Sequence, residues 1–319
     1  MAPAVVSEVP VIGPDDDAFH APSDHEWETE TAWFSFNVPE RRMGGWLYNQ
    51  VLANQGVCNG GAWVWDDSPT GALYETNHQR LPMPAGADLR DITLPNGNTM
   101  AVLEPLQRYR LRYSDPGRFD ADLTFDAVMA PNSHPLGVAP FWKGRHFDQA
   151  GRVTGTIVLD GETIAVDCLS VRDRSWGPRP RGPGKGKAGV GYSFATASGN
   201  DAFLAYTIPM VGSDDVSTGY LIRDGEYAHL VEGRRVVEFD PENRWITRIQ
   251  LEATDELGRQ LHAAGQLVSH HGEAGPGGTG LLFWEWDGAS GWGEDQSYAS
   301  DEIWESLGME AEKADDANI

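Results

Sequence analysis

The residues best suited to chemistry lie near the middle of the chain, beginning with His146 and Asp148. Because one residue separates them, both side chains point to the same side if this stretch is a β-strand. A histidine beside an aspartate is a common way to obtain a base whose pKa is near neutrality. Such pairs also occur on ordinary protein surfaces, so the sequence leaves a catalytic role and a surface role open.

A second candidate is the segment 171–179, which combines three arginines with an aspartate and a tryptophan. Arg174 could bind an oxygen atom of a substrate, or it could hold Asp173 ionised as a base beside a pocket. In the alternative interpretation, Arg172, Asp173 and Arg179 form a salt-bridge cluster that fixes two domains together. Both interpretations place this segment at a junction between two units of structure.

Aromatic side chains are abundant, with 12 Trp, 9 Tyr and 11 Phe among 319 residues. They could fill the interiors of barrels, or they could line an apolar pocket and shelter a carbocation with their π faces. We expect some of them to face a pocket. The substrate-binding candidates are Trp33, Trp46, Trp142, Trp176 and Tyr192, together with Arg179.

Glu285 stands between Trp284 and Trp286 on an expected strand. If these tryptophans face outward between two barrels, Glu285 points into a barrel, where burial would raise its pKa and make it a candidate acid. The same alternation also permits a Glu285 that faces solvent. We include Glu285 among the substrate-binding candidates.

Several kinds of site are not predicted. The glycine-rich stretch 182–187 lacks the strand–loop–helix context of a phosphate-binding loop. His270 and His271 lack further ligands at usable spacing, and Cys58 and Cys168 are far apart in the chain. A G-x-S-x-G motif, typical of hydrolases, does not occur. We therefore expect neither a metal site nor a cofactor.

The sequence has 48 acidic and 24 basic residues, and its net charge is −24. Nucleic acids and anionic membrane surfaces require a positive protein face, so neither is an expected partner. The sequence has no run of about 18 apolar residues, and its N-terminus does not resemble a signal peptide. We expect a soluble cytoplasmic protein that binds a small apolar molecule, with a homodimer left open.

Short strands separated by turns must position these residues. Ranges 152–159 and 163–168 are rich in β-forming residues and are joined by Asp160-Gly161, which is typical of a tight hairpin turn. From Trp245 to Ala253, mostly apolar side chains alternate with polar ones. We predict an all-β chain in which two antiparallel β-barrels pack together.

The turn and glycine patterns divide the chain into five predicted regions. A flexible arm over 1–24 precedes a first barrel over 25–178. A linker over 179–188, rich in Gly, Pro and Lys, leads to a second barrel over 189–305. An acidic tail covers 306–319.

Together these residues resemble a known group of proteins. The runs 144–155, 159–161 and 171–179 resemble the lipocalin-like superfamily that contains carotenoid 1,2-hydratase (hydroxyneurosporene synthase) and AttH-like proteins. Tocopherol cyclase and the fungal decalin-forming cyclases (Diels-Alderases) are similar at a greater distance. The stretches 26–46 and 288–294 resemble the start of the first barrel and the end of the second, so the resemblance spans about residues 25 to 300.

The resemblance implies two lipocalin-like barrels with an apolar pocket reached through their interface. It also implies protonation of an alkene, or folding of a polyene for ring closure. Asp173 and Trp176 match the family's motif, but Arg174 occupies the position of the family's histidine. Because an arginine is not deprotonated in proteins, Arg174 cannot be the general acid, and His146 is the best remaining proton carrier.

The leading hypothesis is a cofactor-independent hydratase, dehydratase or cyclase, hence a hydro-lyase or an isomerase. Its substrate would be an apolar unsaturated molecule of isoprenoid, steroid-like or aromatic type. His146, oriented by Asp148, would carry the proton, Arg174 would anchor an oxygen, and Asp173 and Trp176 would shape the site. The alternative is a lipocalin-like carrier that holds a lipophilic ligand without chemistry, and a third hypothesis is a scaffold for assembly.

Overall fold

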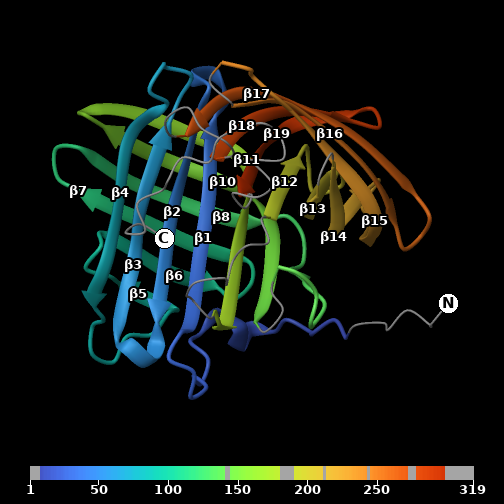
Figure 1. Ribbon diagram of the computed structural model, residues 1–319. Helices are drawn as coiled ribbons and strands as arrows, with labels where there is room; N and C mark the ends of the chain where they lie inside the picture. The colour runs from blue at the N-terminus through green and yellow to red at the C-terminus, as the bar shows by residue number, and fades with distance from the viewer. Residues whose placement is uncertain are drawn as a thin grey trace.

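The computed structural model describes residues 8–140, 144–179, 190–210, 213–242, 245–271 and 278–298, almost all of them in strands or turns. Strands β1 to β11 form one curled antiparallel sheet, the first sheet, and β12 to β19 form a closed barrel (Figure 1). The prediction of an all-β chain with two antiparallel, barrel-like units is therefore confirmed. The first unit follows an open strand path, and the second is fully closed.

The strands are β1 (Glu28–Val38), β2 (Met43–Leu52), β3 (Val57–Trp65), β4 (Ala72–Pro82), β5 (Asp91–Thr93), β6 (Asn98–Glu104), β7 (Arg108–Asp115), β8 (Phe119–Ala127), β9 (Asn132–Ser133), β10 (Arg145–Leu159), β11 (Glu162–Pro178), β12 (Val190–Thr196), β13 (Ala202–Met210), β14 (Ser213–Arg223), β15 (Glu226–Phe239), β16 (Ile246–Asp255), β17 (Gln260–His271), β18 (Gly278–Trp286) and β19 (Ala289–Tyr298). Three short 3-10 helices are η1 (Pro14–Asp17), η2 (Pro39–Arg41) and η3 (Ala53–Gln55).

The hairpin of β10 and β11 is the centre of the first sheet. Asp160 and Gly161 form its turn with φ angles of 47° and 87°, a conformation that Asp and Gly tolerate better than most residues. The hairpin extends well beyond the two short stretches predicted from sequence, because residues 145–151 and 169–178 continue the pairing. β11 also pairs with β1, so the start of the first sheet lies beside its last strand.

Strand alternation gives the hairpin two faces. Val153 and Ile157 face the inner core of the first sheet, where they pack among side chains such as Phe34 and Phe125. Ala150 and Val171 face the opposite way, against the wall of the barrel. Because the side-chain period of a strand is two, Phe147 and Gln149 share the inner face, whereas His146 and Asp148 share the outer one.

The contact between the outer face of the first sheet and the barrel wall is called the seam here. It is a buried, largely aromatic layer to which both units contribute side chains. Such packing stabilises the pair by removing large apolar surfaces from water. The buried seam residues are Trp33, Ala150, Val171, Tyr192, Phe194, Ala202, Leu204, Tyr206, Tyr220 and Ile222.

The described part of the N-terminal arm differs from the expected loose segment. Asp17 is buried in the first sheet, where its carboxylate accepts hydrogen bonds from the backbone N–H of Leu106 and the hydroxyl of Tyr109. His20 stacks on Trp176 with ring centroids 4.1 Å apart. These contacts of Asp17 and His20 hold this part of the N-terminal segment against the first sheet. Much of the predicted linker and all of the acidic tail lie outside the described residues.

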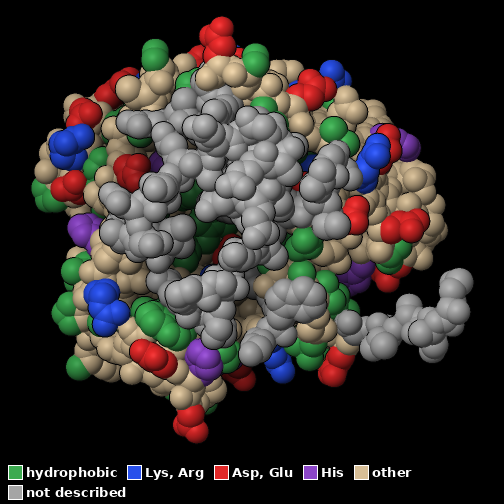
Figure 2. All heavy atoms as spheres, in the orientation of Figure 1, with side chains coloured by type: hydrophobic (Ala, Val, Ile, Leu, Met, Phe, Trp, Pro, Cys, Tyr) green, Lys and Arg blue, Asp and Glu red, His purple; other side chains and the backbone are tan. Residues whose placement is uncertain are grey.

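Charged side chains of both signs are interspersed around the rim of the face shown in Figure 2. The exposed ion pairs of the described residues include Arg152 with Asp167 and Arg110 with Asp122. Among the described residues, no helix is long and apolar enough to cross a membrane.

Candidate active site

A compact polar cluster lies where β10 faces the barrel. Asp148 is fully buried, and each of its carboxylate oxygens meets a histidine. The Oδ2 atom lies 2.9 Å from His134 Nε2, and the Oδ1 atom lies 3.0 Å from His146 Nε2. Both imidazoles are buried as well. The two residues selected from sequence, His146 and Asp148, are therefore in direct contact, and His134 joins them.

The first sheet positions the two histidines through backbone pairing. β9 pairs with β10 so that Asn132 lies opposite Asp148 and Ser133 opposite Phe147. The backbone N–H of His134 then donates to the carbonyl oxygen of His146 over 2.9 Å. These contacts hold a loop residue beside a strand residue that is twelve positions later in the chain. The position of His134 therefore depends on a short strand that sequence patterns did not reveal.

The barrel adds two phenols to the cluster. Tyr192 on β12 donates its hydroxyl to Asp148 Oδ1 over 3.0 Å. The hydroxyl of Tyr206 on β13 lies 2.9 Å from His146 Nε2 and 3.3 Å from Asp148 Oδ1. Tyr192 and Tyr206 are adjacent partners across β12 and β13, which explains why both reach the same carboxylate. The cluster is thus complete only when the two units are packed together.

Burial and charge act on these groups in opposite directions. Burial alone would favour the neutral acid of Asp148, but the two imidazoles outweigh it and hold the pKa of Asp148 below its usual range. Burial lowers the pKa of His146 despite the nearby carboxylate, and it raises the pKa of Tyr192 and Tyr206 well above 10.0. Asp148 is therefore the negative centre of the cluster.

Asp173 lies next to the cluster on the neighbouring strand. It is the cross-strand partner of Asp148 in the β10–β11 pair and of Trp33 in the β1–β11 pair. Burial, together with the charge of Asp148, raises the pKa of Asp173 to about 6, and Arg179 and the imidazole of His146 oppose this shift. The structure therefore brings Asp173 to the same face as the histidines.

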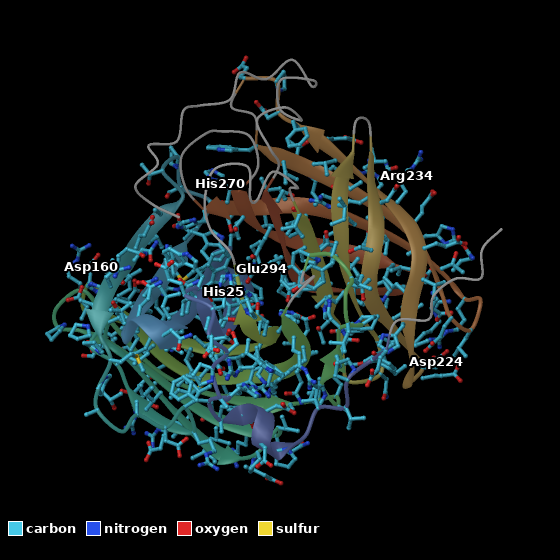
Figure 3. All side chains as sticks on the ribbon, turned by 60° about the horizontal axis from the view of Figure 1, so that its bottom comes forward. His25, Asp160, Asp224, Arg234, His270 and Glu294 are labelled. Atoms are coloured by element: carbon cyan, nitrogen blue, oxygen red, sulfur yellow. The ribbon has the colours of Figure 1, made fainter. Side chains whose placement is uncertain are left out.

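The aromatic layer of the seam continues from the cluster toward β19. Trp33 makes edge contacts with Tyr192 at 6.1 Å and with Trp46 at 5.8 Å between ring centroids. Trp46 donates its Nε1–H to the buried carboxyl of Glu294 over 2.7 Å. Figure 3 shows Glu294 between the outer turns of the two units, which Asp160 and Asp224 mark. Burial raises the pKa of Glu294 to about 8.

Arg174 is not part of this cluster. It lies on the inner face of β11, where its guanidinium pairs with Glu30 and donates to the carbonyl oxygens of Thr31 and Ala18. Arg172 shares that face and pairs with Asp17. The strand period of two places both arginines on the face opposite Asp173. Arg172 therefore forms its pair within the first unit and not between the two units, and a substrate-anchoring role for Arg174 stays a prediction.

Trp176 lies on the face opposite the histidines, whereas Arg179 contacts Ser175, the cross-strand partner of His146. Trp176 packs between His20 and Phe147 on the inner face of the hairpin. Arg179 is half-buried at the end of β11 and donates to the hydroxyl of Ser175, while its charge acts on Asp173. Of these two residues, only Arg179 has a charge that influences the pKa of Asp173.

Glu285 is exposed, and Trp142 lies outside the described residues. Trp284 and Trp286 fill the interior of the barrel, where both contact Phe203. The side chain of Glu285 is therefore exposed on the outside of the barrel and does not line the seam or the interior. Of the two orientations that the sequence left open, the structure shows the solvent-facing one, and a substrate-binding role for Glu285 stays a prediction.

Two side chains of the cluster, His134 and Tyr206, were not selected from sequence. His134 stands in a Pro- and Gly-containing passage with no strand pattern, and Tyr206 is one of many aromatic residues on predicted strands. One ligand atom from each of His134, His146 and Asp148 lies within 4.8 Å of the other two, a grouping that could hold a metal ion. Neither residue type nor spacing in the chain revealed this grouping.

Comparisons with known proteins agree with this architecture. The chain belongs to the family described as "Domain of unknown function (DUF7064)", whose model matches residues 13–295. No curated protein sequence matches the chain.

Three solved structures share the fold. An AttH-like protein (NE1406) from Nitrosomonas europaea has a TM-score of 0.61 and 16% identity, covering 93% of this chain and 99% of that one. Kievitone hydratase from Nectria haematococca has a TM-score of 0.51 and 11% identity, covering 92% and 94%. The Diels-Alderase CghA has a TM-score of 0.58 and 14% identity, covering 86% and 89%. The predicted resemblance to the lipocalin-like hydratase and cyclase superfamily is confirmed at the level of fold.

Proposed function

We propose that this protein is an enzyme that adds water to, removes water from, or closes a ring in an apolar unsaturated small molecule held at the seam. The observation that carries the proposal is the position of Asp148. Its buried carboxylate is held by two histidines from the first sheet and two tyrosines from the barrel. A merely structural seam would be expected to be filled by apolar side chains, because isolated buried carboxylates are costly.

The surroundings of the cluster suit this class of reaction. Acid-catalysed hydration, dehydration and cationic ring closure of an alkene pass through states with positive charge on carbon, which aromatic faces and a nearby carboxylate stabilise. Trp33 and Phe194 supply such faces beside Tyr192. The chain of contacts from His134 through Asp148 to His146 and Tyr206 can activate a water molecule or exchange a proton with the substrate.

The fold supports the reaction class as well. The solved structures with the same fold include a hydratase and a cyclase. An isoprenoid, steroid-like or aromatic substrate is proposed because the seam offers aromatic side chains together with a few polar groups, a combination suited to such molecules.

The test begins with the ligand that accompanies the protein. Native mass spectrometry and organic extraction of freshly purified protein would supply a molecule to incubate with the enzyme and follow for loss or gain of one water, or for an isomer of equal mass. We expect His146→Ala to lower turnover by about 100- to 10,000-fold while the far-UV spectrum stays that of a β-protein. The matched control is His262→Ala, since His262 is an exposed histidine that pairs with Asp287.

Equal turnover in His146→Ala and wild-type protein would contradict the proposal. A ligand that stays bound and never changes under any condition would also contradict it, and would instead indicate a carrier.

A further inference from the structure

His134, His146 and Asp148 each offer a ligand atom, and these three atoms lie within 4.8 Å of one another, close enough to share one metal ion. His134 Nε2 and His146 Nε2 lie 2.9 and 3.0 Å from the two oxygens of Asp148. In zinc sites the metal–ligand distances are about 2.0–2.2 Å, and tetrahedral geometry then places neighbouring ligand atoms about 3.3–3.6 Å apart. One ion could therefore contact both imidazoles and the carboxylate with little movement of the side chains.

Asp148 differs from the buried carboxylates that are paired with an arginine. Asp17 pairs with Arg172, Glu30 with Arg174, and Asp295 with Arg235, and all of these side chains are buried. Asp148 has no arginine or lysine within ion-pair distance among the residues that the structure describes. A buried carboxylate without a cation is costly, and a divalent ion would supply the missing positive charge.

The donor set indicates which kind of ion. Two imidazole nitrogens and one carboxylate oxygen suit Zn²⁺ and neighbouring first-row divalent metals better than Mg²⁺ or Ca²⁺, which prefer oxygen ligands. Three protein ligands leave room for water or substrate, as in catalytic rather than structural zinc sites. The hydroxyls of Tyr192 and Tyr206 contact Asp148, and such outer contacts orient metal-binding carboxylates.

We propose that His134, His146 and Asp148 form a site for one first-row divalent transition-metal ion. This inference rests on the proposed function and deepens it, because the ion would be the group that activates water at the same cluster. His134 and His146 then serve as ligands through Nε2, and Asp148 serves as the third ligand.

The experiment uses the full chain without a histidine tag, dialysed against a chelator and then desalted. Titration with Zn²⁺ alone, followed by elemental analysis, should give about one ion per chain. His134→Ala and His146→Ala should each weaken Zn²⁺ binding at least about tenfold. His262→Ala should bind as wild type does. Co²⁺ added to the wild-type chain should produce visible absorption bands of a nitrogen and oxygen ligand set, a readout that needs no variant.

Less than about one-fifth of an ion per chain in wild type, or unchanged binding in both histidine variants, would overturn the metal site. Turnover that resists the chelator and yet is lost in His146→Ala would overturn the metal site while leaving the proposed function intact. Stoichiometric Zn²⁺ binding without turnover of any co-purified ligand would support the metal site and contradict the proposed function.

Discussion

Buried carboxylates have different partners on the two faces of the β10–β11 hairpin. On the inner face, Arg172 meets Asp17 and Arg174 meets Glu30, so each carboxylate has a guanidinium beside it. On the outer face, Asp148 meets imidazoles and phenols. The same two strands thus carry a charge-balanced structural layer on one side and a carboxylate without a permanent cation on the other.

The side chains on the inner face suit a stabilising role, whereas those on the outer face suit proton transfer. A guanidinium remains charged at all accessible pH values, so the inner pairs cannot exchange protons and serve to anchor the N-terminal segment. Imidazoles and phenols can gain or lose protons and can bind metals, so the outer face could support acid–base or metal chemistry. The comparison favours a structural role for Arg174, which occupies the position of the family's histidine and pairs with Glu30.

The largest expected effect on stability comes from breaking an inner pair. Arg172→Met should lower the free energy of unfolding by about 3–5 kcal/mol, because Asp17 would remain buried without its cation. Urea denaturation followed by tryptophan fluorescence measures the change. The double variant Arg172→Met with Asp17→Asn should recover much of the loss, and a double variant as unstable as the single one would contradict the role given to this pair.

A pH-dependent effect of at most comparable size is expected at Glu294, another seam carboxyl that has no guanidinium partner among the described residues. Its pKa is about 8 in the folded chain against 4.5 for an ordinary glutamate. Because the folded chain holds this proton more tightly, the contribution of Glu294 to stability is full below about pH 4.5 and is lost as the pH rises to about 8.

The stability of wild type relative to Glu294→Gln should therefore fall between pH 5 and pH 8, by at most about 1.4 kcal/mol per pH unit. Denaturation curves of both proteins at several pH values measure this difference, since the other titrating groups cancel. Gln keeps the shape of the side chain and its acceptor for the Trp46 N–H. A difference that is constant with pH would show that Glu294 does not titrate in this range.

The smallest effect is expected on the surface. Arg152 and Asp167 form a two-point ion pair at 2.7 Å, but both side chains are exposed. Solvent weakens such a pair, and fixing two long side chains costs entropy, so Arg152→Ala should leave the unfolding midpoint within experimental error. A loss comparable with that of Arg172→Met would remove the distinction between buried and exposed pairs.

Much of the architecture could be predicted from local patterns. The Asp160-Gly161 turn, the alternation along β16 and the lack of helical periodicity all follow from short-range conformational preferences. The pairing of His146 with Asp148 could also be predicted, since residues two apart on a strand share a face. The domain boundaries stay predictions, because part of the junction lies outside the described residues.

The sequence by itself determined the strands, their turns and which side chains share a face, because these depend on neighbours in the chain. Only the tertiary structure decided which face is buried and what it meets. It turned Glu285 outward, paired Arg174 with Glu30, and brought His134, Tyr192 and Tyr206 to Asp148. The physical reason is that a strand has two equivalent sides until another sheet packs on one of them, and the partner of a buried charge is set by that packing.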